Sequence, residues 1–143
     1  MGEFCSRSMA IRELDRFLVL VTIRTPSDAE WERYLQLYEF PETRAKRVLV
    51  YASASPTASQ RMRLRAAEGE YPPRKAVMAC TKEARVAAVA ASWFNSQLRL
   101  FSAADVDPAL DYIGAIGSER TLVLRTLDDL RRELSMPRST RAI

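Results

Sequence analysis

The chain has 143 residues, of which 48% are hydrophobic and 28% are charged, and its formal net charge is +4. This length fits one compact domain, and the composition is typical of a globular protein rather than a disordered one. The sequence contains no histidine, which excludes Ser-His-Asp and Cys-His catalysis, the HExxH zinc site and a histidine phosphorelay. With two cysteines and four glycines, it also has no cysteine-rich zinc site, phosphate loop or dinucleotide fingerprint. We therefore expect no metal, no cofactor and no enzymatic activity.

The first eight residues, MGEFCSRS, are interpreted as an expression-tag remnant, with Met9 as the natural start. The predicted single domain then covers 9–135, and the basic segment 136–143 is predicted to be a flexible tail. Cys80 becomes the only native cysteine, so we expect no intramolecular disulfide and a cytoplasmic location. The longest apolar run, 17–21, is too short to span a bilayer.

The apolar, β-branched run 16–24 predicts a buried strand that Pro26 terminates. Ser27 and Glu30 then form a capping box, which predicts the start of a helix. Four large side chains recur along this helix on one face, which predicts that they pack on a sheet. These side chains are Trp31, Tyr34, Leu35 and Tyr38.

A second strand is predicted at 47–52, followed by a helix that either Ser55 or Thr57 caps and Gly69 ends. The predicted inward positions of this helix are Met62 and Ala66. A third strand is predicted at 75–80.

Thr81 is predicted to cap the next helix, which is apolar on most of its circumference. This pattern predicts burial on more than one side, and the residues that create it include Val86, Val89, Trp93 and Phe94. A short fourth strand is predicted at 98–101.

A further helix begins at Ser102 or at Asp107 and ends before Gly114. The run from Ser118 allows a strand at 121–124, but a helix is favoured because leucine and valine recur at helical spacing. These residues are Val123, Leu127, Leu130 and Leu134. The alternation of strands and helices predicts an α/β fold: a four-stranded, mostly parallel sheet with helices on both faces and an extra C-terminal helix.

Several features between 74 and 114 resemble the SpoIIAA-like branch of the STAS/SEC14 superfamily. They are a basic-flanked strand (Lys75-Ala76-Val77-Met78), an alanine-rich helix ending in Ser92-Trp93-Phe94, a strand ending in Phe101, and a last helix with Tyr112-Ile113-Gly114. The segment VLVYASASPTASQRMRL also resembles the second strand and helix of small stand-alone members, so the likeness covers most of 16–114.

This resemblance implies a small cytoplasmic protein that binds a partner or a small ligand. The superfamily includes anti-anti-sigma regulators and lipid-carrying relatives. The D-S-[ST]-G-L sequence whose serine is phosphorylated in those regulators is absent here, so no phosphoserine is assigned. The sequence thus predicts a regulatory module that contacts a protein partner or a second copy of itself; the alternatives are a carrier of a small hydrophobic ligand or lipid, and an anion-handling enzyme.

The candidate regulatory or anion site lies where the second predicted strand meets its helix. Ser53, Ser55 and Thr57 would lie near the helix N-terminus, which attracts anions, and Arg61 and Arg65 follow on the same helix. Helix capping explains the same hydroxyl residues and is the favoured interpretation.

Cys80 offers a second candidate, a thiol at a strand end and helix start, with Thr81 and Arg85 beside it. The spacing from Cys80 to Arg85 is one residue shorter than the C-x5-R phosphate loop, and a small buried residue is the favoured interpretation. A third candidate is a pocket for a hydrophobic ligand lined by aromatic residues, although core packing is favoured for them. These aromatic residues are Trp31, Tyr34, Trp93 and Phe94.

Positive charge gathers in the segment 42–75, where eight basic and three acidic side chains leave an excess of +5. Such a patch can attract phosphates or an acidic partner. Apart from Tyr51 and Tyr71, no aromatic residues interleave these arginines as a base-stacking surface would need, so a solvated helix face is favoured and no nucleic-acid partner is expected.

Overall fold

The computed structural model describes residues 2–135 of the chain, and the predicted tail at 136–143 lies outside them. The strands are β1 (Glu3–Cys5), β2 (Met9–Glu13), β3 (Phe17–Thr22), β4 (Arg47–Ala52), β5 (Lys75–Ala79) and β6 (Leu98–Ser102). The helices are α1 (Asp28–Gln36), the 3-10 turn η1 (Leu37–Glu39), α2 (Pro41–Arg44), α3 (Ala58–Glu68), α4 (Lys82–Ser92), α5 (Asp107–Ile113) and α6 (Gly117–Ser135).

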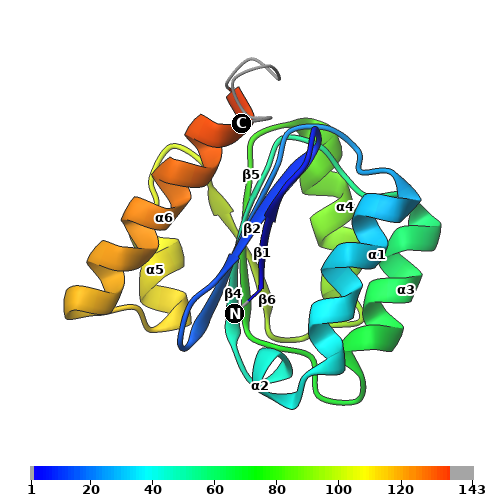
Figure 1. Ribbon diagram of the computed structural model, residues 1–143, viewed down its shortest axis with the longest axis horizontal. Coiled ribbons are helices and arrows are strands. Elements are labelled where there is room, and N and C mark those ends of the chain that lie inside the picture. Colours follow the sequence, from blue (N-terminus) through cyan, green and yellow to red (C-terminus); the bar gives the residue numbers. More distant parts are fainter. Residues whose placement is uncertain (1, 136–143) are drawn as a thin grey trace.

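The strands form one sheet in the order β1-β2-β3-β4-β5-β6. Strands β3 to β6 are parallel, whereas β1 and β2 are joined to them by antiparallel pairing. The helices α1, α3 and α4 lie on one side of the sheet, and α5 and α6 lie on the other (Figure 1). The predicted α/β class is confirmed.

The prediction of four strands is wrong, because β1 and β2 extend the sheet by two strands. The segment Met9–Glu13 is short and ends in two charged residues, so its apolar pattern is weak, and its partner β1 lies in the segment set aside as a tag remnant. In the fold, Met9, Ala10 and Ile11 are fully buried. Strand pairing and packing from both faces therefore define β2, and the sequence shows neither.

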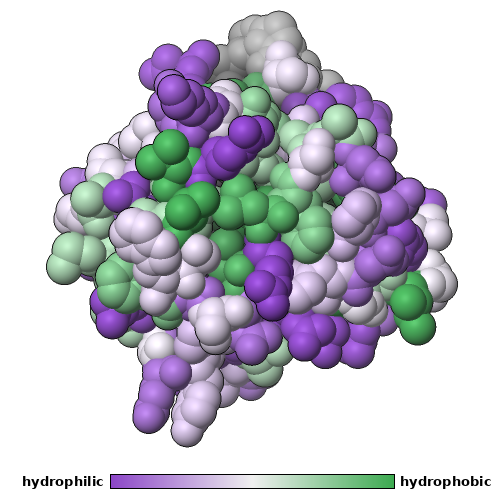
Figure 2. Space-filling view, turned by 180° about the vertical axis from the view of Figure 1, so that it is seen from behind, coloured by the Kyte–Doolittle hydropathy of each residue, from purple (hydrophilic) through white to green (hydrophobic). Residues whose placement is uncertain are grey.

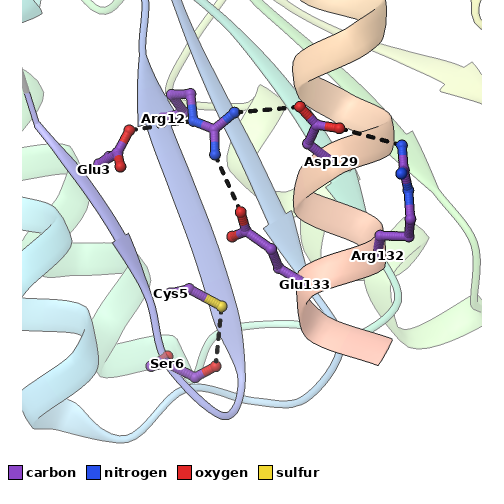
Figure 3. Close-up of polar contacts among 7 residues, drawn as sticks. All are labelled: Glu3, Cys5, Ser6, Arg12, Asp129, Arg132 and Glu133. Carbon is purple, nitrogen blue, oxygen red and sulfur yellow. Dashed lines mark hydrogen bonds and ion pairs between the residues drawn. The ribbon is translucent and has the colours of Figure 1, made fainter. Parts of the chain in front are cut away.

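Arg12 on β2 connects the N-terminal hairpin to the last helix (Figure 3). Its guanidinium lies 3.3 Å from the Glu3 carboxylate on β1, and 3.6 Å and 3.2 Å from Asp129 and Glu133 on α6. Exposed ion pairs are each worth about 0–1 kcal/mol, so this cluster orients β1 and β2 more than it stabilises the fold.

The core between the sheet and the C-terminal helices confirms the helix predicted from Ser118. The four predicted leucine and valine positions of α6 are all buried against β3 and its neighbours, so the alternative strand at 121–124 is wrong. The helix before it begins at Asp107 rather than Ser102, because β6 continues to Ser102.

The opposite core contains α1, as its capping box and apolar stripe predict. Ser27 and Glu30 make both capping-box hydrogen bonds. The indole N–H of Trp31 donates to the Gln60 carbonyl at 2.8 Å, and the hydroxyls of Tyr34 and Tyr38 are 2.8 Å apart. The buried polar atoms of these aromatic residues are thus satisfied.

The inward face of α3 combines the polar Gln60 and Glu68 with the partly buried Leu64 and Ala67, and the prediction that Met62 and Ala66 point inward is wrong. Met62 is 73% exposed and Ala66 is exposed, whereas Gln60 and Glu68 are buried. The Gln60 side chain donates to the Pro26 carbonyl at 2.8 Å. Hydrophobic periodicity misassigns this helix because its inward polar groups have specific partners.

The helix α4 is buried on one side only, so the prediction of wider burial is wrong. Ala84, Ala87 and Ala88 are buried, and Ala84 and Ala88 pack against the sheet. In contrast, Val86 is 60% exposed and Trp93 is 76% exposed. The helix lies over the last two strands, where no described element covers its outer side. The exposed apolar residues of this helix and of the turn that follows it are Val86, Val89, Trp93 and Phe94.

Candidate functional site

The turn from Ser53 to Thr57 is fixed by neighbouring strand ends. The Ser53 N–H donates to the Thr22 carbonyl at 2.9 Å, and the Thr81 hydroxyl donates to the Ser53 carbonyl at 3.0 Å. Thr57, rather than Ser55, caps α3, because its hydroxyl accepts the Gln60 N–H at 3.1 Å. The capping interpretation of Thr57 is therefore confirmed.

Only one of the two arginines predicted for this turn lies there. Arg61 donates to the Pro56 carbonyl at 2.9 Å, which places its guanidinium at the start of α3. The Arg65 guanidinium instead lies 4.0 Å from the ring centre of Phe94, beyond the end of α4. The structure thus groups Ser53, Ser55, Thr57 and Arg61, whereas Arg65 lies away from this turn, beside Phe94.

Cys80 is exposed, so the expectation of a small buried residue is wrong. Its position follows the last residue of β5, and Thr81 caps α4 by accepting the Ala84 N–H at 3.2 Å. Cys80 and Arg85 line one open hollow of about 790 Å³ beside β6. A hydrogen bond with Cys80 raises the pKa of the Tyr51 hydroxyl, and the Arg131 guanidinium stacks 4.3 Å from the Tyr51 ring.

A groove between α3 and α4 is a second feature that the sequence did not predict. It has a volume of about 590 Å³. Exposed apolar side chains line it together with arginines, namely Met62, Trp93 and Phe94 with Arg61 and Arg65. The sequence placed these apolar residues in the core, because a hydrophobic pattern does not distinguish a covered helix face from an uncovered one.

The base of this groove contains a buried ion pair. The Lys75 ammonium lies 2.6 Å from the Glu68 carboxylate, and the two side chains are only 6% and 7% exposed. Burial alone would lower the pKa of Lys75, but the Glu68 carboxylate and Tyr34 together outweigh burial, so the pKa is raised above the ordinary lysine value. Burial also raises the pKa values of Tyr34 and Tyr38. The pair is charged and satisfied internally.

A small inner pocket of about 90 Å³ lies between this groove and the sheet. Trp31 and Tyr34 line the inner pocket, whereas Trp93 and Phe94 line the groove. The four aromatic residues of the predicted ligand pocket therefore do not line one cavity. The groove and the inner pocket share Arg61, Leu64, Lys75, Ala91 and Leu98.

Within residues 2–135, no cluster of three or more cysteine or acidic side chains is arranged to hold a metal ion. None of the helices in this part of the chain has both the length and the hydrophobicity that a membrane span requires. Comparison with protein families, with curated proteins and with solved structures found no match.

Proposed function

We propose that this protein is a non-enzymatic regulatory module that binds a protein partner through the α3/α4 surface. This surface consists of Met62, Val86, Val89, Trp93 and Phe94 together with the groove-lining Arg61 and Arg65. The observation that carries the proposal is the exposure of all five apolar residues, which ranges from 42% for Val89 to 76% for Trp93. Contiguous exposed apolar residues rimmed by polar ones are typical of protein-binding surfaces.

The charges of this surface indicate an acidic partner. Neither Arg61 nor Arg65 forms an ion pair with any of the described carboxylates, and the Glu68 carboxylate below them is neutralised by Lys75. Arginine beside aromatic residues is also the composition of interface hot spots. The partner's contact surface should therefore combine apolar side chains with Asp or Glu.

The resemblance to SpoIIAA-like proteins supports a regulatory role and a cytoplasmic location, both of which are part of the proposal. The candidate site at Ser53, Ser55 and Thr57 adjoins this surface through Arg61, whose guanidinium lies at the turn and also lines the groove. A phosphate added to Ser55 would bring negative charge next to Arg61 and would weaken attraction of an acidic partner.

A capture experiment with matched variants tests the proposal. The immobilised chain is exposed to extract from the cells that make it, and bound proteins are compared for the wild type, Trp93→Ser and Ile116→Ser. Ile116 is 72% exposed, like Trp93, but follows α5 in the layer across the sheet. A partner retained by the wild type and Ile116→Ser but lost by Trp93→Ser supports the proposal.

The partner should also dissociate as salt is raised, because arginine–carboxylate attraction is screened. Equal capture by all three proteins would contradict a role for the α3/α4 surface.

The connection between the groove and the inner pocket favours a second candidate, a carrier of a small hydrophobic ligand. The inner pocket of about 90 Å³ is smaller than usual ligand sites of about 300–1,000 Å³. An acyl chain would therefore have to lie mainly in the groove. Native mass spectrometry distinguishes the two functions, because a carrier retains a lipid that Trp93→Ser releases.

A further inference from the structure

Strand β6 forms one edge of the sheet, and its outer side is not paired with any described strand. The Lys75 N–H donates to the Gln97 carbonyl at 3.2 Å. This hydrogen bond shows which residues of β6 direct their backbone N–H and carbonyl groups toward β5. Alternate residues of a parallel strand bond to the same neighbour, so Arg99 and Phe101 also direct their backbone groups toward β5. Leu98, Leu100 and Ser102 consequently direct theirs outward.

We propose that β6 pairs with β6 of a second copy of this chain, antiparallel and about a two-fold axis at Leu100. In this register, Leu100 exchanges two N–H to carbonyl hydrogen bonds with Leu100 of the second copy. Each Ser102 N–H meets the Leu98 carbonyl of the other copy, which adds two more. The resulting sheet has twelve strands, and this interface does not involve the groove of the α3/α4 surface.

The side chains of β6 suit this self-pairing. Residues directly opposite in an antiparallel pair project to the same face and contact each other. On the α5 face, Arg99 of each copy would lie opposite Phe101 of the other copy. The two equivalent pairs permit cation–π contacts. On the α4 face, the half-buried Leu100 would lie opposite itself and lose its remaining exposure to water.

Charge complementarity favours a second copy in the antiparallel orientation. The guanidinium groups of Arg74 and Arg99 lie 5.2 Å and 5.8 Å from the Tyr112 ring, so positive charge gathers at the start of β6. Asp105, just beyond its end, is exposed and forms no ion pair with the described cations. An antiparallel two-fold brings Arg74 and Arg99 at the start of each strand toward Asp105 beyond the end of the other, where Arg85 also lines the hollow. A parallel pairing would instead place the arginines at the two strand starts next to each other.

The surface around β6 is hydrophobic and lacks the usual protection of a strand edge. Figure 2 shows hydrophobic side chains gathered near the middle of the face that carries β6, ringed by hydrophilic ones. Val89, Leu100 and Phe101 line the open hollow beside the strand. Exposed edges are normally protected by proline, bulges or several charges, and β6 has only Arg99. A second copy would remove this edge from water.

Cysteine cross-linking tests the register in a chain that carries Cys5→Ser and Cys80→Ser. Opposite residues of a hydrogen-bonded pair have Cα atoms about 5.5 Å apart, which suits a disulfide. Leu100→Cys should therefore form a covalent dimer on mild oxidation. Ser102→Cys is the matched control: it is also on β6 and is exposed, but it lies opposite Leu98 and should stay uncross-linked.

Light scattering on the wild type should give a mass of twice the 16.2 kDa chain. Ser102→Pro removes two of the four outward hydrogen bonds without removing a bond to β5, so dimerisation should weaken at least about tenfold. Three results would overturn the proposal. The first is a wild type that is monomeric at about 100 μM, and the second is a dimer in which Ser102→Cys cross-links as well as Leu100→Cys. The third is a monomer that binds an acidic extended peptide at β6.

Discussion

The buried ion pair between Lys75 and Glu68 gives the sharpest stability prediction. Replacing Lys75 with Met keeps the volume of the side chain but leaves the Glu68 carboxylate without its cation, 2.6 Å from where the ammonium lay. Breaking one partner of a buried pair costs about 3–5 kcal/mol. We expect Lys75→Met to lower the free energy of unfolding by this amount at pH 7.

Urea unfolding followed by fluorescence of the buried Trp31 measures this loss of stability. Arg16→Met is the matched control, because it removes the cation of an exposed pair with Glu119, whose two side chains are 52% and 36% exposed. Arg16→Met should lower the free energy of unfolding by less than about 1 kcal/mol. The double variant Lys75→Met/Glu68→Leu should recover most of the loss. A cost for Lys75→Met no larger than that of Arg16→Met would refute the reasoning.

Three further predictions concern a cap, the buried tyrosines and the thiol. Thr57→Ala should lower the free energy of unfolding by about 1 kcal/mol, measured by urea titration, because it leaves a helical N–H of α3 unsatisfied; Thr57→Ser should restore the cap, and equal loss in both variants would contradict it. Burial raises the pKa values of Tyr34 and Tyr38, so the folded state keeps these protons above pH 10 while the unfolded state releases them. The urea midpoint should thus be unaffected by these groups below pH 10 and fall between about pH 10 and 11.5, and a constant midpoint there would argue against their burial. In a Cys5→Ser chain, Cys80 should react with a thiol reagent as fast in buffer as an exposed thiol does, since the folded protein exposes it; reaction only after urea is added would show that it is covered.

The local sequence signals determined the central elements of the fold. The β-branched runs predicted β3 and β4, and the bounds of β4 agree with the predicted 47–52. The hydroxyl residues at Ser27, Thr57 and Thr81 predicted three helix starts, because each side chain accepts a nearby backbone N–H and needs no distant partner.

The candidate site was only partly predictable from sequence. Arg61 lies at the Ser53–Thr57 turn because both belong to one short strand-to-helix connection. Arg65 contacts Phe94, a residue far along the chain, so its position depends on how α3 and α4 lie side by side. The groove between these helices is likewise a property of two separate segments.

The sequence by itself determined that this is an α/β protein and, to within two residues, where its parallel strands begin and end, since those features depend on local periodicity and capping. Only the tertiary structure decided which apolar residues meet water. Trp31 and Trp93 both lie in apolar helical segments, yet one is 3% and the other 76% exposed. The sheet covers Trp31 on α1, whereas α4 has no neighbour over Trp93, because helix coverage depends on the order of the strands and on where the sheet stops.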